Sequence, residues 1–78
     1  MARAAYYVVL HEGDWKINHL GKHYGPFKTQ EQAIKVAVDT AQKEGQRSPD
    51  GAQVLVQGRN NKFRVEWTYG RDPYPPVG

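Results

Sequence analysis

The sequence predicts an α+β domain with the order ββαββ, in which two β-hairpins form a roughly four-stranded sheet and one amphipathic helix packs on one face. Short segments rich in β-branched and aromatic residues stand on both sides of one longer segment with helical spacing. Its 78 residues are enough for a single domain. We expect a folded core at residues 6–69, a loose arm at 1–5 and a proline-rich tail at 70–78.

The first hairpin is predicted from two strand-like segments joined by a turn. Residues 6–10 are aromatic and β-branched, and residues 15–20 alternate between apolar and polar well enough for a second strand. Gly13 lies between them, where a turn needs a residue that tolerates positive φ. Alternation directs two apolar side chains to the core and two polar side chains to solvent, namely Trp15 and Ile17, and Lys16 and Asn18.

The helix is predicted from its start signal and its apolar spacing. Residues 21–28 contain glycine and proline, and we expect them to be irregular. Thr29 and Gln32 form a capping box, in which each side chain bonds to the backbone of the other. Gly45 is the expected end of the helix. Apolar residues recur at helical spacing at Ala33, Ile34, Ala37, Val38 and Ala41.

The second hairpin joins a short strand at residues 54–56 to a longer strand at 63–69. Seven residues alternate without a break in the longer strand. This pattern predicts one apolar face, made of Phe63, Val65, Trp67 and Tyr69, and one polar face, made of Arg64, Glu66 and Thr68. In such a short chain, large rings are needed inside, so we expect the core to contain Trp15, Phe27, Phe63 and Trp67.

Composition limits the functions that are open to the chain. It has no cysteine, so neither a disulfide nor a thiolate metal site is available. Eleven Lys and Arg against eight Asp and Glu give a net charge of +3, which is compatible with an anionic partner without requiring one. No segment has the length of a membrane span or the pattern of a signal peptide. We expect a cytoplasmic protein with no membrane partner.

Short motifs along nearly the whole chain carry a family resemblance. They are Tyr6-Tyr7-Val8-Val9, Trp15 after a Gly-Asp turn, residues 27–30 leading into the helix, residues 54–58, and residues 66–73. Together they resemble a small bacterial family, domain-of-unknown-function family 2188. The resemblance implies a ββαββ domain of bacteria and their phages, and it implies no established activity. The second hairpin turn has Asn60-Asn61 where the family often has Asp-Gly.

No enzyme or metal site is expected from the residues. His19 and His23 have a helical metal-ligand spacing, but the glycines around them argue against a helix, and no third ligand follows. The only serine, Ser48, lies in a polar loop without a positioned base. We therefore expect no catalytic residue, no cofactor and no metal.

Basic residues give the leading functional hypothesis. Arg59, Lys62 and Arg64 cluster on the second hairpin, and Lys16 lies on the first. The sheet face opposite the helix is predicted to carry Lys16, Asn18, Arg64, Thr68 and one of two tyrosines, Tyr6 or Tyr7. Such a face contacts phosphates and stacks on bases, although Glu66 is predicted to lie in its middle. We therefore predict a non-enzymatic binding module for nucleic acid, with phosphate contacts from Lys16, Arg59, Lys62 and Arg64. A solvated face of mixed charge is the simpler alternative.

The second functional hypothesis is a protein-interaction or self-assembling module, which would bind a protein partner or form a homodimer. It would use an exposed sheet edge or the proline-rich tail, with Tyr74, Pro75 and Pro76 as contact residues. Alternatively, the tail folds back, and Pro73 and Tyr74 cover the edge of the sheet or the rim of the core.

Overall fold

A computed structural model describes residues 4–58 and 60–74. In this part of the chain the element order is βββαββ. The elements are β1 (Ala4–His11), β2 (Asp14–His19), β3 (Lys22–Phe27), α1 (Gln30–Arg47), β4 (Ala52–Gln57) and β5 (Phe63–Thr68). The α+β class is confirmed, but the predicted ββαββ order is wrong because the sheet has a fifth strand. Strand β1 begins at Ala4, so two residues of the expected arm belong to the sheet.

Strand β3 occupies residues that the sequence predicted to be irregular. It pairs with β2 alone and forms one edge of the sheet. Gly25 and Pro26 interrupt the strand pattern, and the pairing register shifts between Trp15 and Ile17 of β2. An edge strand tolerates proline because one of its sides needs no backbone donor. The breakers therefore mark an edge position and not the absence of a strand.

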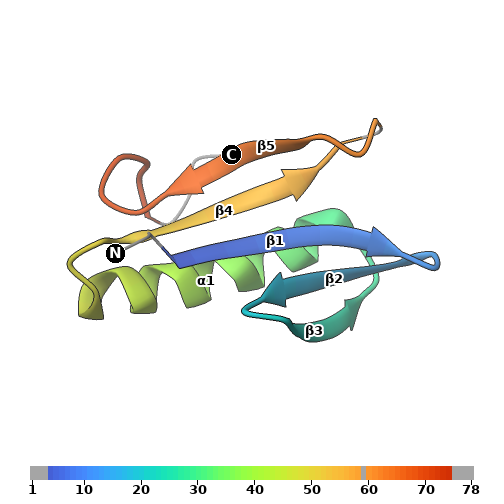
Figure 1. The fold of residues 1–78 in the computed structure, drawn as a ribbon, viewed down its shortest axis with the longest axis horizontal. Helices are drawn as coiled ribbons and strands as arrows, with labels where there is room; N and C mark the ends of the chain where they lie inside the picture. The colour runs from blue at the N-terminus through green and yellow to red at the C-terminus, as the bar shows by residue number, and fades with distance from the viewer. Residues whose placement is uncertain (1–3, 59, 75–78) are drawn as a thin grey trace.

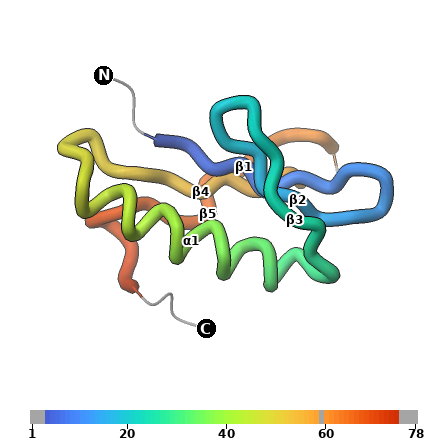
Figure 2. The backbone as a smooth tube through the Cα atoms, turned by 90° about the horizontal axis from the view of Figure 1, so that it is seen from below, coloured from blue at the N-terminus to red at the C-terminus, as the bar shows by residue number. Residues whose placement is uncertain are grey.

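The sheet has the order β3-β2-β1-β4-β5. Neighbouring strands are antiparallel except β1 and β4, which are parallel from Ala4 beside Ala52 to Val8 beside Val56. Helix α1 provides the crossover from β3 to β4 (Figure 1). Seen along the sheet, α1 lies on one side of the strands (Figure 2). Within residues 4–58 and 60–74, no second layer covers the opposite face.

The core lies between α1 and the sheet. It is built from small and β-branched side chains together with two large rings, Tyr6 and Trp67. Trp15 and Phe27 are partly buried and pack against this cluster. The helix contributes alanines, which let it lie close to the strands: the buried residues are Ala33, Ala37, Val38, Ala41 and Gly45.

Helix α1 begins as predicted and ends later than predicted. The backbone N–H of Gln32 donates to Thr29 Oγ1 at 3.1 Å, and Gln32 Oε1 accepts from the backbone of Lys28 and not of Thr29. The helix continues through Gly45 to Arg47. Gly45 is needed for packing, because a Cβ atom there would overlap the Tyr69 ring. The prediction of a glycine stop is therefore wrong.

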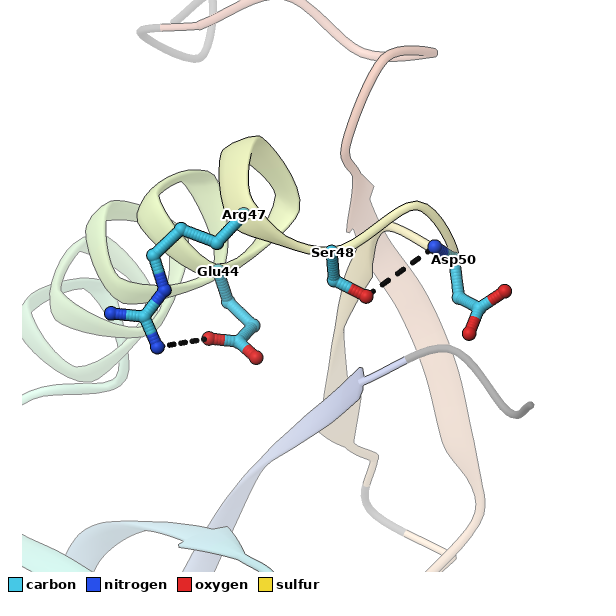
Figure 3. Close-up of polar contacts among 4 residues, drawn as sticks. All are labelled: Glu44, Arg47, Ser48 and Asp50. Atoms are coloured by element: carbon cyan, nitrogen blue, oxygen red, sulfur yellow. Dashed lines mark hydrogen bonds and ion pairs between the residues drawn. The ribbon is translucent and has the colours of Figure 1, made fainter.

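The actual end of α1 is closed by local polar contacts (Figure 3). The guanidinium of Arg47 lies 3.4 Å from the Glu44 carboxylate one turn earlier. The N–H of Ser48, the C-cap residue, donates to the Glu44 carbonyl, and the Ser48 hydroxyl accepts from the backbone of Asp50. These bonds turn the chain toward β4.

A β-bulge in β5 overturns the predicted single apolar face of that strand. Val54 and Leu55 are adjacent in β4, yet they pair with Trp67 and Val65, so Glu66 is the extra residue. A one-residue insertion reverses the side on which the following side chains lie. Trp67 therefore enters the core with 2% exposure, whereas Phe63 lies on the uncovered face with 43% exposure. The expectation of a core position for Phe63 is wrong.

Candidate functional site

The uncovered sheet face carries a contiguous apolar surface. Cross-strand pairing places Asn18, Tyr7, Leu55 and Val65 in one row across β2, β1, β4 and β5. Phe63 and Val9 lie on the same face one step further along their strands. We call the apolar members of this surface the sheet-face patch, which consists of Tyr7, Val9, Leu55, Phe63 and Val65. Tyr7 is 37% exposed and Val65 is 53% exposed.

Two aromatic rings form the centre of the sheet-face patch. The Tyr7 and Phe63 rings meet edge to face, with centroids 5.2 Å apart and planes at 80°. They come from β1 and β5 and reach each other across β4. Exposed large apolar residues in one group mark an interaction surface more often than scattered ones do.

The polar residues of this face are mainly neutral or basic. Lys16 pairs with Val9 in the ladder, and Asn18 pairs with Tyr7. Gln53 and Thr68 form another pair, in which Gln53 Nε2 donates to the Thr68 hydroxyl at 3.3 Å. The Glu66 carboxylate, predicted to lie in the middle of the face, instead lies 3.3 Å from Arg64 Nη2.

The predicted basic cluster is only partly assembled. Lys16 and Asn18 lie on the uncovered face as expected, and Lys62 is exposed beside the β4–β5 turn. Arg64 pairs with the buried Val56 and lines a groove with Trp15, so its predicted place on the uncovered face is wrong. The bulge that moved Phe63 outward also moved Arg64 inward. Arg59 lies outside the described residues.

Sequence reasoning missed most of the sheet-face patch. The expected single tyrosine is Tyr7, because Tyr6 is buried under the helix. A signal for the other apolar members was present in the uninterrupted apolar runs at residues 6–10 and 54–56. An apolar run without alternation places apolar side chains on both faces of a strand, as it does in strands that are covered on both sides.

The histidines that have a metal-ligand spacing lie on different strands. His19 ends β2 and His23 belongs to β3. His19 Nδ1 donates to the Ala5 carbonyl at 2.8 Å, and its ring stacks on Tyr6 with a centroid distance of 4.0 Å. Across residues 4–58 and 60–74, no three His, Asp or Glu side chains gather as a metal site would require.

In the same residues, no helix has the length and apolar character needed to cross a membrane.

Near this stack, a small apolar pocket of about 200 Å³ opens between α1 and the sheet, lined by Ile17, Tyr24 and Val36 among others. Tyr6 also lines this pocket. Burial raises the pKa of Tyr6, and the negative charge of Glu44 acts in the same direction. Tyr6 therefore stays protonated at neutral pH and serves as a packed, neutral ring.

The start of the C-terminal tail folds back onto the core. The indole N–H of Trp67 donates to the Pro73 carbonyl at 2.9 Å, and the Tyr74 hydroxyl donates to Asp39 Oδ1 at 2.8 Å. The Tyr74 ring also meets Trp67 edge to face. Residues 73–74 therefore cover the rim of the core, as the fold-back alternative predicted. Pro75 and Pro76, the other residues of the predicted partner-binding tail, lie outside the described residues.

We expect the Tyr74–Asp39 contact to weaken at high pH. The hydrogen bond to Asp39 raises the pKa of Tyr74 above the ordinary tyrosine value, so folding favours the protonated hydroxyl. This contribution to stability is complete below about pH 10 and is lost as pH rises through the raised pKa. Urea unfolding of the natural chain and Tyr74→Phe at pH 8 and 11 checks it. The natural chain should be more stable at pH 8, and a difference that grows toward pH 11 would contradict the assignment.

A comparison with protein-family models matches residues 6–69 to the family described as uncharacterized protein conserved in bacteria (DUF2188). The chain belongs to this family. No curated protein and no solved structure matches the chain. The predicted family resemblance is thus confirmed. The matched span begins within β1 and includes all of the other strands and the helix. The matched DUF2188 region ends at Tyr69, so the fold-back contacts of Pro73 and Tyr74 lie beyond it.

Proposed function

We propose that this DUF2188 domain is a non-enzymatic binding module that holds single-stranded nucleic acid on the uncovered face of its sheet. The observation that carries the proposal is the exposed pair of rings, Tyr7 and Phe63, on an open face. Bases stack on aromatic side chains of a sheet because every base has a flat apolar surface. A duplex keeps its bases stacked inside, so the proposal is limited to single strands.

The surroundings of the rings support this ligand. Lys16 stands at one side of the sheet-face patch and supplies a cation for a phosphate. Asn18, beside Tyr7 in the ladder, offers both a donor and an acceptor to the edge of a base. The Glu66 carboxylate is held at Arg64, which removes the repulsion that the sequence predicted for this face.

We expect short labelled DNA and RNA single strands to bind with an affinity that falls with salt. Phe63→Ala should weaken binding about tenfold, because one stacked base contributes ~1–3 kcal/mol. Lys16→Glu should weaken binding and lower the log–log salt slope by about one unit. Fluorescence anisotropy at two salt concentrations measures both effects.

The matched control is Lys43→Glu, because Lys43 is exposed on the helix and its substitution changes the net charge equally. It should leave the affinity nearly unchanged if the sheet face is the binding surface. Equal losses for Lys16→Glu and Lys43→Glu would mean that only overall charge matters. Absence of binding at low salt would refute the proposal outright.

Self-association is the second candidate, and the apolar character of the same face favours it. Two sheet-face patches can pack against each other at the usual sheet-to-sheet spacing of about 10 Å. Burial of Val65, Phe63 and Tyr7, now partly in water, would drive the contact. In this candidate, the partner that covers the sheet-face patch is a second copy of this chain.

Sedimentation equilibrium tests the second candidate. A dimer is expected to dissociate in Val65→Asp, which places a charge in the patch, and to persist in Val36→Asp, which places the same charge at another exposed valine, on the helix. A monomer at all concentrations would exclude self-association and leave the nucleic-acid proposal standing.

A further inference from the structure

The end of the sheet beside the start of α1 contains a groove that the sheet-face proposal does not use. The groove has a volume of about 470 Å³ and is lined by residues of β1, β2, β4, the β4–β5 turn, β5 and the start of α1. These strand ends lie together in Figure 1, at the side where β1 ends. We call it the helix-start groove; the side chains that line it are Leu10, Trp15, Gln30, Gln57, Asn61 and Arg64.

Three kinds of chemistry meet in this groove. Trp15 and Leu10 provide an apolar wall that suits a flat ring. Gln30 and Asn61 carry amides that both donate and accept hydrogen bonds. Arg64 provides a guanidinium with five donors, whose fork geometry matches phosphate oxygens.

We infer that the helix-start groove binds one nucleotide, with the base against Trp15, the amides at the base edge and the phosphate at Arg64. The volume falls within the range of small-ligand pockets, about 300–1,000 Å³. The unit bound is either a free mononucleotide or the end of a strand, since both present the same base and phosphate. This inference uses none of the residues of the sheet-face patch and does not depend on the proposed function.

The amides are held in a defined arrangement. Gln57 Oε1 accepts from the backbone of Leu10 at 3.0 Å, and Gln57 Nε2 donates to Asn61 Oδ1 at 3.0 Å. Because Asn61 accepts through its oxygen, its amino group is oriented as a donor for a ligand. A preorganised donor binds more tightly than a mobile one, since less entropy is lost on binding.

Glu66 regulates the strength of the phosphate contact. Its carboxylate lies 3.3 Å from Arg64 Nη2, and both side chains are partly exposed. An exposed ion pair of this kind contributes little stability, so a phosphate can displace Glu66 or share the guanidinium. The carboxylate also repels a phosphate, and removing its charge should therefore tighten binding.

Nuclear magnetic resonance with adenosine monophosphate as the probe tests the inference. The chain has two tryptophans, and their indole N–H signals separate the groove from the core. The Trp15 signal should shift on titration, while the signal of the buried Trp67 should stay in place. Adenosine alone and inorganic phosphate alone should each bind more weakly than the nucleotide. A Trp15 signal that stays fixed at millimolar nucleotide overturns the inference.

Substitutions of the two members of the Arg64–Glu66 ion pair should have effects of opposite sign on nucleotide binding. Arg64→Gln should weaken nucleotide binding about tenfold, because a hydrogen bond to a charged group is lost. Glu66→Gln should strengthen it, a result that a merely structural role of the ion pair would not produce. Weaker binding in both variants contradicts the assigned role of Glu66 and overturns the inference.

Phe63→Ala separates this site from the sheet face. The variant should lose affinity for single strands and keep the nucleotide-induced shift of Trp15. In the natural chain, a nucleotide-induced shift of Trp15 together with absence of strand binding would support the groove and reject the sheet face. A strand with a terminal phosphate that shifts Trp15 more strongly than the mononucleotide would identify a strand end as the bound unit.

Discussion

Replacement of Trp67 by alanine is expected to remove a large part of the stability of the domain. Truncation of a buried tryptophan costs about 3–5 kcal/mol, and a chain of 78 residues has a total folding free energy of about 4–12 kcal/mol. Trp67 also joins β5 to the tail, because its indole donates to Pro73 and its ring contacts Tyr74. One substitution therefore opens the core and releases the tail contact. Urea denaturation followed by circular dichroism measures the loss.

Phe63→Ala is the matched control for this prediction. Both residues are aromatic and belong to the same strand, and the bulge at Glu66 places them on opposite faces. Because Phe63 is exposed on the uncovered face, its truncation should cost less than about 1 kcal/mol. Equal losses for the two variants would mean that Phe63 is buried too, and that the bulge is absent.

Gly45→Ala is expected to destabilise the domain, although alanine is the better helix former. The helix propensity of alanine favours the variant by about 1 kcal/mol. The added Cβ atom would overlap the Tyr69 ring at a buried position, and overpacking of this kind costs about 1–3 kcal/mol. We expect the steric cost to exceed the gain, with a net loss of about 1 kcal/mol in urea denaturation.

The opposing terms are separated by repeating the substitution without the ring. In a Tyr69→Ala background the overlap disappears, and Gly45→Ala should then stabilise the domain by ~0.5–1 kcal/mol. The change of sign is the decisive result. If Gly45→Ala has the same effect in both backgrounds, the contact with Tyr69 does not determine the choice of glycine.

The elements with complete local signals were predictable from the sequence. The Thr29 cap and the apolar spacing of α1 depend on neighbouring residues, as does the alternation that directs Trp15 inward and Lys16 outward. Strand β3 could not be predicted because glycine and proline occur both in loops and in edge strands, so their presence does not distinguish the two. The end of α1 was misplaced because the role of Gly45 depends on Tyr69, which is distant in the sequence.

The candidate site was less predictable because one bulge controls it. The pattern at residues 63–69 is a perfect alternation, and nothing in it marks Glu66 as the extra residue. Whether a strand contains a bulge depends on the partner strand, here on which β4 residues must face α1. The bulge exchanged the predicted places of Phe63 and Arg64, which created both the sheet-face patch and the cationic side of the helix-start groove.

The parallel pairing of β1 with β4 has a consequence for synthesis on the ribosome. Ala4 pairs with Ala52, so this ladder can form only after residues 52–56 have been synthesised. Until then, the nascent chain exposes an unpaired edge of β1. Chains with such distant contacts fold more slowly than chains with local ones. Once β4 has emerged, β1 becomes an interior strand, and the edge that invites pairing with other chains is closed. The time between the emergence of these two strands is thus an interval in which the open edge of β1 favours aggregation.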